Sequence, residues 1–238
     1  MPTRRAFLAA CLTACTRAET TVRLRARPGK TTDSALKPGV TPLNLRAERD
    51  ALLYLPASAP DPAPFVLYLH GATGNEQQGV RRLSALADEF GFLLLSPASG
   101  EGTWDAIRSG YGPDVSFIDQ ALSKAFSQRR VDTRRIAICG FSDGASYALG
   151  LGLSNGDLFQ AVMAFSPGFI PSGAQDTGNP RIFISHGTKD QILPIDDCSR
   201  RLVPQLKRAG HNVTFREFDG PHAMPPEIAR EAFTWLLK

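Results

Sequence analysis

From residue 43 to the C-terminus, short apolar runs alternate with longer amphipathic segments, and this alternation constrains the fold more than any other feature of the chain. The run at 65–69 (FVLYL) is apolar throughout, which is typical of a strand buried on both faces of a sheet. The segment at 80–90 instead places its apolar residues on one face of a helix. The pattern predicts strands at 65–69, 92–95, 135–139, 161–165, 182–185 and 212–218. It predicts helices at 80–90, 115–126, 145–153, 196–209 and 225–237.

Strands and helices that alternate in this way form an α/β fold with a mostly parallel, doubly wound sheet. Residues 43–45 and 51–55 predict a hairpin that adds antiparallel strands at the N-terminal edge of this sheet. A chain of 238 residues with 42% hydrophobic and 21% charged residues is long enough for one well-buried domain and short for two. We therefore expect a single domain over 43–238, with no insertion long enough to form a large lid.

The net charge of +4 comes largely from the N-terminal part of the chain, where Arg4, Arg5 and further basic residues between 17 and 37 are found. The remainder is close to balanced and carries no basic stripe or recognition helix, so we expect no nucleic-acid partner. Cys139 falls on a predicted central strand and Cys198 on a predicted peripheral helix. A disulfide between such positions is disfavoured, and we expect both to be buried free thiols.

Residues 1–15 have the order of an export signal, in which a charged start is followed by an apolar run too short to span a bilayer. Arg4 and Arg5 lie in a segment that resembles the twin-arginine export motif. The sequence L-T-A-C ending at Cys15 resembles a lipoprotein box, and a second match ending at Cys11 would have a very short apolar stretch. Two interpretations stay open, a lipoprotein attached to a membrane through Cys15 and a secreted protein whose leader is cleaved.

Residues 16–42 are rich in Arg, Pro, Thr and Gly. Apolar and polar residues alternate over 21–27, which is compatible with a short edge strand. The other interpretation is a linker between the export signal and the folded domain.

The sequence G-F-S-D-G at 140–144 follows a predicted buried strand and precedes a helix of small and apolar residues. This strand–turn–helix setting is the one that a nucleophile elbow requires. Gly140 and Gly144 fit it because side chains there would collide with the neighbouring strand and helix. Ser142 would then stand above the sheet edge at the positive end of the helix, as the nucleophile of an acyl-transfer reaction.

Asp190 follows the predicted strand 182–185, one strand beyond 161–165, so its carboxylate would lie within reach of a histidine over the same edge of the sheet. Asp196 and Asp197 are the local competitors. They stand at the start of a predicted helix, where aspartates commonly act as caps, so Asp190 is the preferred acid.

His222 follows the last predicted strand and would therefore lie at the carboxyl edge, as Ser142 does. In the Ser…Asp…His order the base must come after Asp190, which leaves His211 and His222. His211 precedes the last strand and would lie at the opposite edge. The sequence thus predicts a catalytic triad of Ser142, Asp190 and His222, with His222 as base.

The segment H-G-A-T-G at 70–74 follows the predicted strand 65–69. Acyl transfer needs donors that face the oxygen on which negative charge develops. We expect the backbone N–H groups of Ala72 and Asp143 to be these donors, and His70 to hold the loop without a catalytic role.

Trp104 and Tyr111 lie between the predicted strand 92–95 and the following helix. They are candidates for the walls of a substrate pocket, and the alternative is that they only anchor the loop.

With these residues identified, a family resemblance can be stated. From about residue 52 to 235 the chain resembles the polyhydroxybutyrate-depolymerase and feruloyl-esterase branch of the α/β-hydrolases, and the related phospholipase/carboxylesterase group. The segments that carry the resemblance are L-H-G at 69–71, D-V-S-F-I at 114–118, V-D-T-R-R-I at 131–136 and G-F-S-D-G at 140–144.

The resemblance implies an α/β-hydrolase fold and a serine esterase, with Ser142, Asp190 and His222 as the triad and Ala72 and Asp143 as oxyanion donors. No metal or organic cofactor is implied. The chain has no evident substrate-binding domain, which favours a small ester as the substrate over a polymer. The alternatives are a thioesterase or peptidase on the same fold, and a non-catalytic surface lipoprotein that keeps a hydrolase scaffold.

Overall fold

The protein, represented by a computed structural model, is described over residues 22–31 and 36–237. In this part of the chain eight strands form one sheet in the order β1-β2-β4-β3-β5-β6-β7-β8. β1 pairs antiparallel with β2 and β2 with β4, whereas all the other pairs are parallel. The predicted parallel sheet with an antiparallel N-terminal edge is confirmed. The strands are β1 (Gly39–Pro42), β2 (Ala51–Leu55), β3 (Ala63–Leu69), β4 (Leu93–Pro97), β5 (Val131–Phe141), β6 (Ala161–Phe165), β7 (Arg181–Gly187) and β8 (Val213–Phe218).

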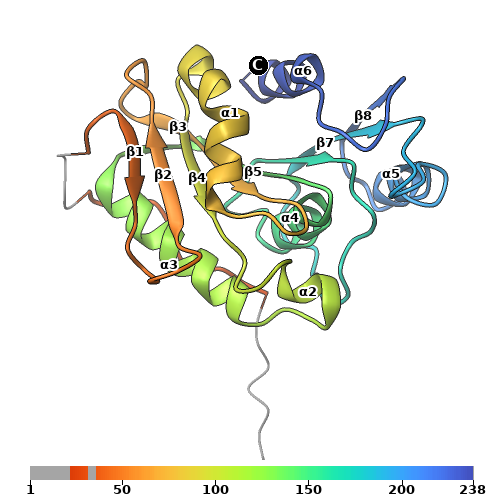
Figure 1. Cartoon of the computed structure of the whole chain (residues 1–238), viewed down its shortest axis with the longest axis horizontal. Helices are drawn as coiled ribbons and strands as arrows, with labels where there is room; N and C mark the ends of the chain where they lie inside the picture. The colour runs from red at the N-terminus through yellow and green to blue at the C-terminus, as the bar shows by residue number, and fades with distance from the viewer. Residues whose placement is uncertain (1–21, 32–35, 238) are drawn as a thin grey trace, which may run out of the picture.

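Helices cover both faces of the sheet (Figure 1). Two of them, α1 and α6, lie side by side on one face, and α3 and α4 lie on the other. The short helix α2 contacts α4, and α5 packs against β7 and β8. The helices are α1 (Glu76–Phe90), α2 (Asp105–Arg108), α3 (Pro113–Gln128), α4 (Asp143–Ser154), α5 (Ser199–Arg208) and α6 (Pro226–Leu237).

The apolar strand β3 explains why two helix layers are needed. Phe65, Leu67 and Leu69 belong to the core beneath α3 and α4, whereas Val66 and Tyr68 belong to the core beneath α1 and α6. Successive side chains of a strand point to opposite faces, so an uninterrupted apolar run can be buried only between two layers. The helix α4 is the most central of the helices, and residues 144–154 are all buried.

The hairpin at the N-terminal edge begins earlier than the sequence predicted. The first strand is β1 (Gly39–Pro42) and not 43–45, and Pro42 lies opposite Leu52. The reason is Asp50, whose carboxylate accepts the backbone N–H groups of Asn44, Leu45 and Arg46. These bonds wrap 44–46 into the turn, so the residues are not free to pair as a strand.

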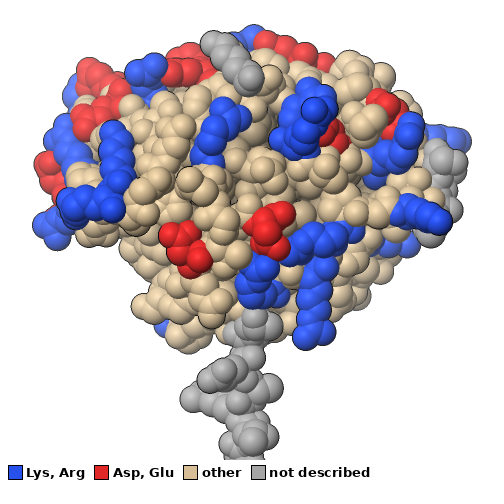
Figure 2. Space-filling view, turned by 180° about the vertical axis from the view of Figure 1, so that it is seen from behind, with Lys and Arg blue, Asp and Glu red and all other residues tan. Residues whose placement is uncertain are grey.

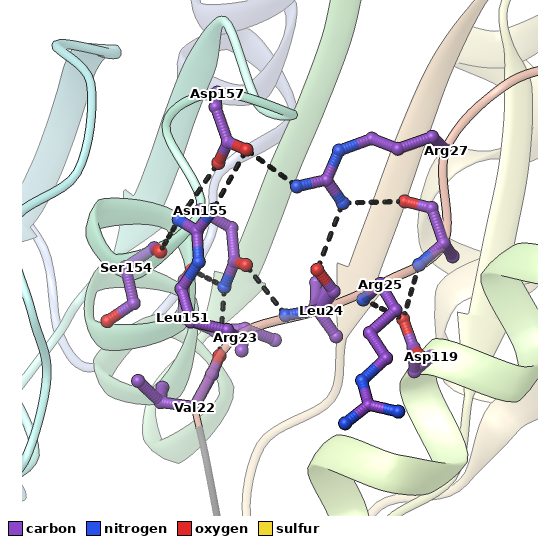
Figure 3. Close-up of polar contacts among 11 residues, drawn as sticks. Val22, Arg23, Leu24, Arg25, Arg27, Asp119, Leu151, Ser154, Asn155 and Asp157 are labelled. Atoms are coloured by element: carbon purple, nitrogen blue, oxygen red, sulfur yellow. Dashed lines mark hydrogen bonds and ion pairs between the residues drawn. The ribbon is translucent and has the colours of Figure 1, made fainter.

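Residues 22–27, which we call the N-terminal strap, form neither a linker nor a strand of the sheet. The strap is extended, and Val22, Leu24 and Ala26 are buried while the residues between them are more exposed. The predicted alternation is therefore real. Its polar groups bond to side chains of α3 and of the turn after α4 and not to a neighbouring strand (Figure 3).

Two of the three arginines of the strap are engaged in ion pairs. Arg23 and Arg27 both contact the carboxylate of Asp157, at 2.9 and 2.6 Å. On the face shown in Figure 2, Lys and Arg stand in separate groups with acidic and uncharged side chains between them.

The predicted export signal at 1–15, with Cys15, lies outside the described residues. Within the described ranges no helix has the length and apolarity to cross a membrane.

Both cysteines of the described chain are buried and free, as the sequence predicted. Cys139 is on β5, in the middle of the sheet, and Cys198 directly precedes α5. Burial raises the pKa of both thiols, which keeps them protonated and unreactive.

Candidate active site

Ser142 forms a tight elbow between β5 and α4. Its backbone has φ 58° and ψ −121°, a conformation that side-chain-bearing residues adopt only under strain. A β-carbon on Gly140 would lie 2.2 Å from the carbonyl oxygen of Gly144, and one on Gly144 would lie 2.1 Å from that of Leu69. Both glycines are therefore required by close backbone approach. The N–H of Ser142 donates to the carbonyl of Phe165 at 2.9 Å, which holds the elbow against β6.

The three residues predicted as a triad lie in one hydrogen-bonded chain. Nε2 of His222 lies 2.9 Å from Oγ of Ser142, and Nδ1 of His222 lies 2.6 Å from Oδ2 of Asp190. Ser142 and Asp190 are buried, and the His222 ring is mostly covered. Residues separated by up to 80 positions in the sequence thus meet at the carboxyl edge of the sheet, where the sequence predicted them.

The loop after β8 places His222 through backbone bonds to the loop after β7. The N–H of Thr188 donates to the carbonyl of Phe218, and the N–H of Lys189 donates to the carbonyl of Gly220, each at 2.9 Å. The ring of Phe141 packs against the His222 ring with 4.8 Å between centroids. The imidazole is therefore fixed in position by its loop on one side and by the chain neighbour of Ser142 on the other.

Asp190 is held by more than His222. Its Oδ1 accepts the N–H groups of Ile192 and Leu193 at 2.9 and 2.8 Å, and its Oδ2 lies 3.1 Å from Nε2 of His186. Burial alone would raise the pKa of Asp190. The N–H of Leu193, the His222 ring and the N–H of Ile192 outweigh burial and hold the pKa below its ordinary value. The carboxylate is thus kept ionised and oriented.

His186 is a member of this site that the sequence did not identify. It is completely buried, with Nδ1 2.7 Å from Oγ of Ser199 and Nε2 2.8 Å from the carbonyl of Leu193. Burial lowers the pKa of His186, which favours a neutral ring whose Nε2–H donates to the carbonyl of Leu193, with Oδ2 of Asp190 beside it. The available signal was its place at the end of the apolar run of β7, directly before the loop that carries Asp190.

The competing residues are engaged elsewhere. Asp196 and Asp197 form ion pairs with arginines four residues further along the chain. His211 contacts Asp176 at 3.0 Å and precedes β8, at the opposite edge of the sheet.

The loop after β3 passes directly beside Ser142. A β-carbon on Gly71 would lie 3.3 Å from Cβ of Ser142, so the next residue, Ala72, is close to Ser142. Asp143 is the first residue of α4, where backbone N–H groups have no partner within the helix. Neither the N–H of Ala72 nor that of Asp143 donates to another backbone group among the described residues, so both remain available to a ligand.

His70 holds this loop from within the protein. Its Nε2 accepts the N–H of Ser99 at 3.0 Å, and its carbonyl accepts the indole N–H of Trp104 at 2.8 Å. Burial lowers the pKa of His70 to about 4, so the ring stays neutral and serves as an acceptor. This is the structural place that the sequence predicted for His70.

Of the two candidates for a pocket wall, Trp104 has no accessible surface and does not fill that role. Trp104 is completely buried between the rings of His70 and Tyr147, so it supports the loop after β3 from beneath. Tyr111 packs on Tyr147 and reaches Gly150, eight residues along α4 from Ser142 and about 12 Å away at 1.5 Å per residue. Trp104 therefore anchors the loop, the alternative that the sequence had left open, whereas Tyr111 is partly exposed and stays a candidate for the pocket wall.

This arrangement defines the class of the protein. An eight-stranded, mostly parallel sheet with helices on both faces carries Ser142 on a strained strand-to-helix turn, with His222 and Asp190 at the same edge. This is the α/β-hydrolase fold. Within that superfamily the chain belongs to the phospholipase/carboxylesterase family, which matches residues 114–237.

The individual proteins that the chain resembles include esterases. The chain is 30% identical over 154 residues to the bifunctional acetylxylan esterase/xylanase XynS20E of Neocallimastix patriciarum, and 26% identical over 229 residues to the acetylxylan esterase of Coprinopsis cinerea. These matches cover 62% and 76% of this chain, and 22% and 59% of the relatives. The chain therefore spans only part of the length of these relatives.

Among solved structures, S-formylglutathione hydrolase (FrmB) from Staphylococcus aureus has a TM-score of 0.68 at 16% identity. The match covers 84% of this chain and 99% of that protein. At this level of identity the likeness concerns the fold. It shows that nearly the whole of a known hydrolase superimposes on this chain.

Proposed function

We propose that this protein hydrolyses carboxylic esters through an acyl-enzyme intermediate on Ser142. The observation that supports the proposal most directly is the hydrogen-bonded chain from Ser142 through His222 to Asp190, with distances of 2.9 and 2.6 Å. A buried ionised carboxylate beside Nδ1 selects the tautomer in which Nδ1 carries the proton. Nε2 is then free to accept the serine proton, as a general base must.

The reaction has two halves. In the first, Oγ of Ser142 attacks the ester carbonyl carbon while its proton passes to Nε2 of His222, and the carbonyl oxygen becomes negative beside the N–H groups of Ala72 and Asp143. The charged imidazole then gives the proton to the departing alcohol. In the second half, water attacks the acyl carbon while its proton passes to Nε2 of His222, and the ring then returns this proton to Oγ of Ser142 as the bond to the acyl group breaks and the acid leaves. Asp190 stabilises the charged ring in both halves without taking its proton.

The substrate that we propose is a small ester. The relatives include acetylxylan esterases, which supports an ester over a thioester or a peptide. Their own length is only partly covered by this chain, so the whole substrate is part of the proposal. Among the described residues no group of three or more His, Cys, Asp or Glu could hold a metal ion, and none of the proposed steps requires one.

We also propose that residues 1–15 direct export, either with Cys15 as a lipid-bearing residue or with a leader that is cleaved. The folded domain then follows, and its boundary lies before the strap at 22–27, because the strap contributes buried side chains to the core.

The decisive variant is Ser142→Ala. With p-nitrophenyl acetate as substrate, the variant should lose at least about 10³-fold in kcat, because the nucleophile is gone while the rest of the site remains. The exposed Ser116 on α3 provides the matched control, and Ser116→Ala should retain wild-type rates.

A fluorophosphonate probe should label wild type and Ser116→Ala but not Ser142→Ala. Parallel assays on a thioester and a peptide separate the proposed activity from its alternatives. Equal turnover by wild type and Ser142→Ala, or no turnover and no labelling of the wild type, would reject the proposal.

A further inference from the structure

Large apolar side chains are exposed at few places, and two of these places adjoin the proposed active site. In the described part of the chain three such side chains are strongly exposed, Val40 at 48%, Phe169 at 42% and Ile192 at 70%. Single exposed apolar residues are ordinary on protein surfaces, so exposure alone has no meaning. The position of Phe169 and Ile192, on the loops that follow β6 and β7, requires a closer look.

The loop that carries Phe169 is bonded to the start of α4. Oγ of Ser146 accepts the N–H of Gly168 at 2.9 Å, and the N–H of Phe169 lies 3.5 Å from the same oxygen. Ser146 is one turn after Ser142, and its N–H donates to the carbonyl of Ser142 at 3.0 Å. The backbone of Phe169 is therefore two hydrogen-bonded contacts from the nucleophile.

The loop that carries Ile192 is bonded to the acid of the site. The N–H of Ile192 donates to Oδ1 of Asp190 at 2.9 Å, and the carbonyl of Leu193 is held by Nε2 of His186 at 2.8 Å. The backbone at 192–193 is thus fixed from both sides. Despite this anchoring, the Ile192 side chain remains the most exposed of the three.

The two loops touch each other beside the site. Gly168 has no side chain, and the position that a β-carbon would take there lies 3.4 Å from Cδ2 of Leu193, so the Leu193 side chain stands directly beside Gly168. Phe169 and Ile192 are the residues next to this contact, one on each loop. Phe169 and Ile192 are thus exposed apolar residues on two adjacent loops at the carboxyl edge of β6 and β7, and we call this pair the apolar rim.

We propose that the apolar rim, Phe169 and Ile192, binds a hydrocarbon group of the ester, so that the enzyme prefers esters with a longer alkyl chain or an aromatic ring over acetate of a small alcohol. The inference rests on the proposed function, because it concerns the substrate of the same site. Removing one methylene from water contributes a factor of about four to binding. A rim that covers a few methylenes or one face of a ring therefore changes selectivity measurably.

The test compares selectivity ratios in the full chain. One series varies the acyl group, from p-nitrophenyl acetate to the butyrate and the octanoate, and a second varies the alcohol, from methyl to hexyl and benzyl acetate. The variant is Phe169→Ser with Ile192→Ser. Both side chains are exposed, and the bonds to Asp190 and Ser146 come from the backbone, so the substitutions leave these bonds in place.

Wild type should favour the longer or aromatic esters in at least one series. In that series the ratio of kcat/KM for the favoured ester to kcat/KM for the shortest ester should fall about tenfold in the double variant. Val40→Ser is the matched control, since Val40 is exposed to a similar degree but lies on β1 at the other end of the sheet. It should keep the wild-type ratios.

A ratio that stays within about twofold of wild type in both series would overturn the inference while leaving the proposed esterase activity intact. An absence of turnover on every ester by the wild type would instead reject the proposed function. Gel filtration at several concentrations adds one more arm. If the double variant changes the oligomeric state and leaves the ratios unchanged, the rim is a contact between copies of this chain and the inference is overturned.

Discussion

The two ends of α4 differ in whether their hydrogen-bonding groups have partners. At its N-terminal end the helix starts from the strained backbone of Ser142, without a side-chain cap, and the N–H of Asp143 has no backbone partner among the described residues. At its C-terminal end Asn155 accepts the N–H of Leu24 and donates to the carbonyls of Val22 and Leu151, with distances of 2.8 to 3.0 Å. One end keeps its hydrogen-bonding groups available, and the other satisfies them with side-chain and strap partners.

In this helix of 12 residues, one end therefore serves the proposed catalysis and the other end serves the stability of the fold. The strained backbone at Ser142 costs about 1–3 kcal/mol, which the surrounding structure must supply. The C-terminal end can supply part of it, because its bonds are buried and tie α4 to the N-terminal strap. We therefore expect substitutions at the first end to reduce catalysis with little change in stability, and substitutions at the second end to do the reverse.

The largest expected effect is that of Asp190→Asn at the catalytic end. The amide oxygen can still accept the N–H groups of Ile192 and Leu193, so the loop keeps its conformation. The amide nitrogen then faces Nδ1 of His222 and favours the wrong tautomer, in which Nε2 carries the proton and cannot act as a base. We expect kcat to fall by about 10⁴-fold, measured on p-nitrophenyl acetate.

The same substitution at the other end provides the comparison. Asp157→Asn removes the charge that pairs with Arg23 and Arg27, and it should leave kcat within about twofold of wild type. If both variants reduced kcat equally, or if Asp190→Asn retained wild-type turnover, the proposed division between the two ends of the helix would fail.

The next effect concerns stability and comes from Asn155→Ala. The change leaves the buried N–H of Leu24 and two carbonyl groups without their partner, and unsatisfied buried groups cost about 1–3 kcal/mol each. Allowing for relaxation, we expect a loss of about 3 kcal/mol in the free energy of unfolding and a fall in Tm of about 5–10 °C. Calorimetry or urea unfolding measures both.

Catalysis should be unaffected in the folded fraction of Asn155→Ala. Asn155 lies 12 residues along from Asp143, about 18 Å at 1.5 Å per residue. The exposed Asn212, with the same substitution, is the matched control and should leave the Tm unchanged. An unchanged Tm in Asn155→Ala, or a large loss of kcat at a temperature where the variant is folded, would contradict the expectation.

The comparison also explains what the sequence could reveal. Ser142, Asp190 and His222 follow three strands whose carboxyl ends must meet at one edge, so the convergence follows from the order of strands and helices alone. For the strap, the order of strands and helices does not predict which residues it contacts. Its bonds join residues more than 90 positions apart through side chains, and alternation alone does not reveal whether an extended segment pairs with a strand or with side chains.

Side-chain partners that no local pattern indicates also explain why the sequence did not predict the positions of Trp104 and His186 in full. Trp104 was placed correctly at the catalytic edge, but the direction of its side chain depends on the carbonyl of His70, which no local pattern indicates. His186 lies one residue inside the end of β7, and only the fold shows that its ring meets Oδ2 of Asp190. Strand ends can be predicted from the sequence, whereas the partners of individual side chains depend on tertiary packing.

The smallest expected effect is a dependence of the strap on pH. Burial raises the pKa of Asp157, but the guanidinium groups of Arg23 and Arg27 outweigh it and hold the pKa below its ordinary value. A carboxylate with a lowered pKa stabilises the folded state above the ordinary Asp pKa of about 4, and this contribution is lost as the pH falls through the lower, folded value. The strap should therefore loosen at acidic pH, before the rest of the molecule unfolds. The effect is small because these side chains are about a third or more exposed and their attraction is screened by salt.

Hydrogen-exchange protection factors, which are corrected for the intrinsic rate, measure this loosening segment by segment. The N–H of Leu24, bonded to Asn155, should lose protection between pH 5 and pH 3, while the amides of central β5 stay protected. In Asp157→Asn, which has no titrating carboxyl at that position, strap protection should be lower at neutral pH and change less on acidification. If the strap and β5 lost protection together in both proteins, the strap would belong to the same cooperative unit as the sheet. The two ends of α4 would then unfold together, and Asp157 would not stabilise the strap independently of the sheet.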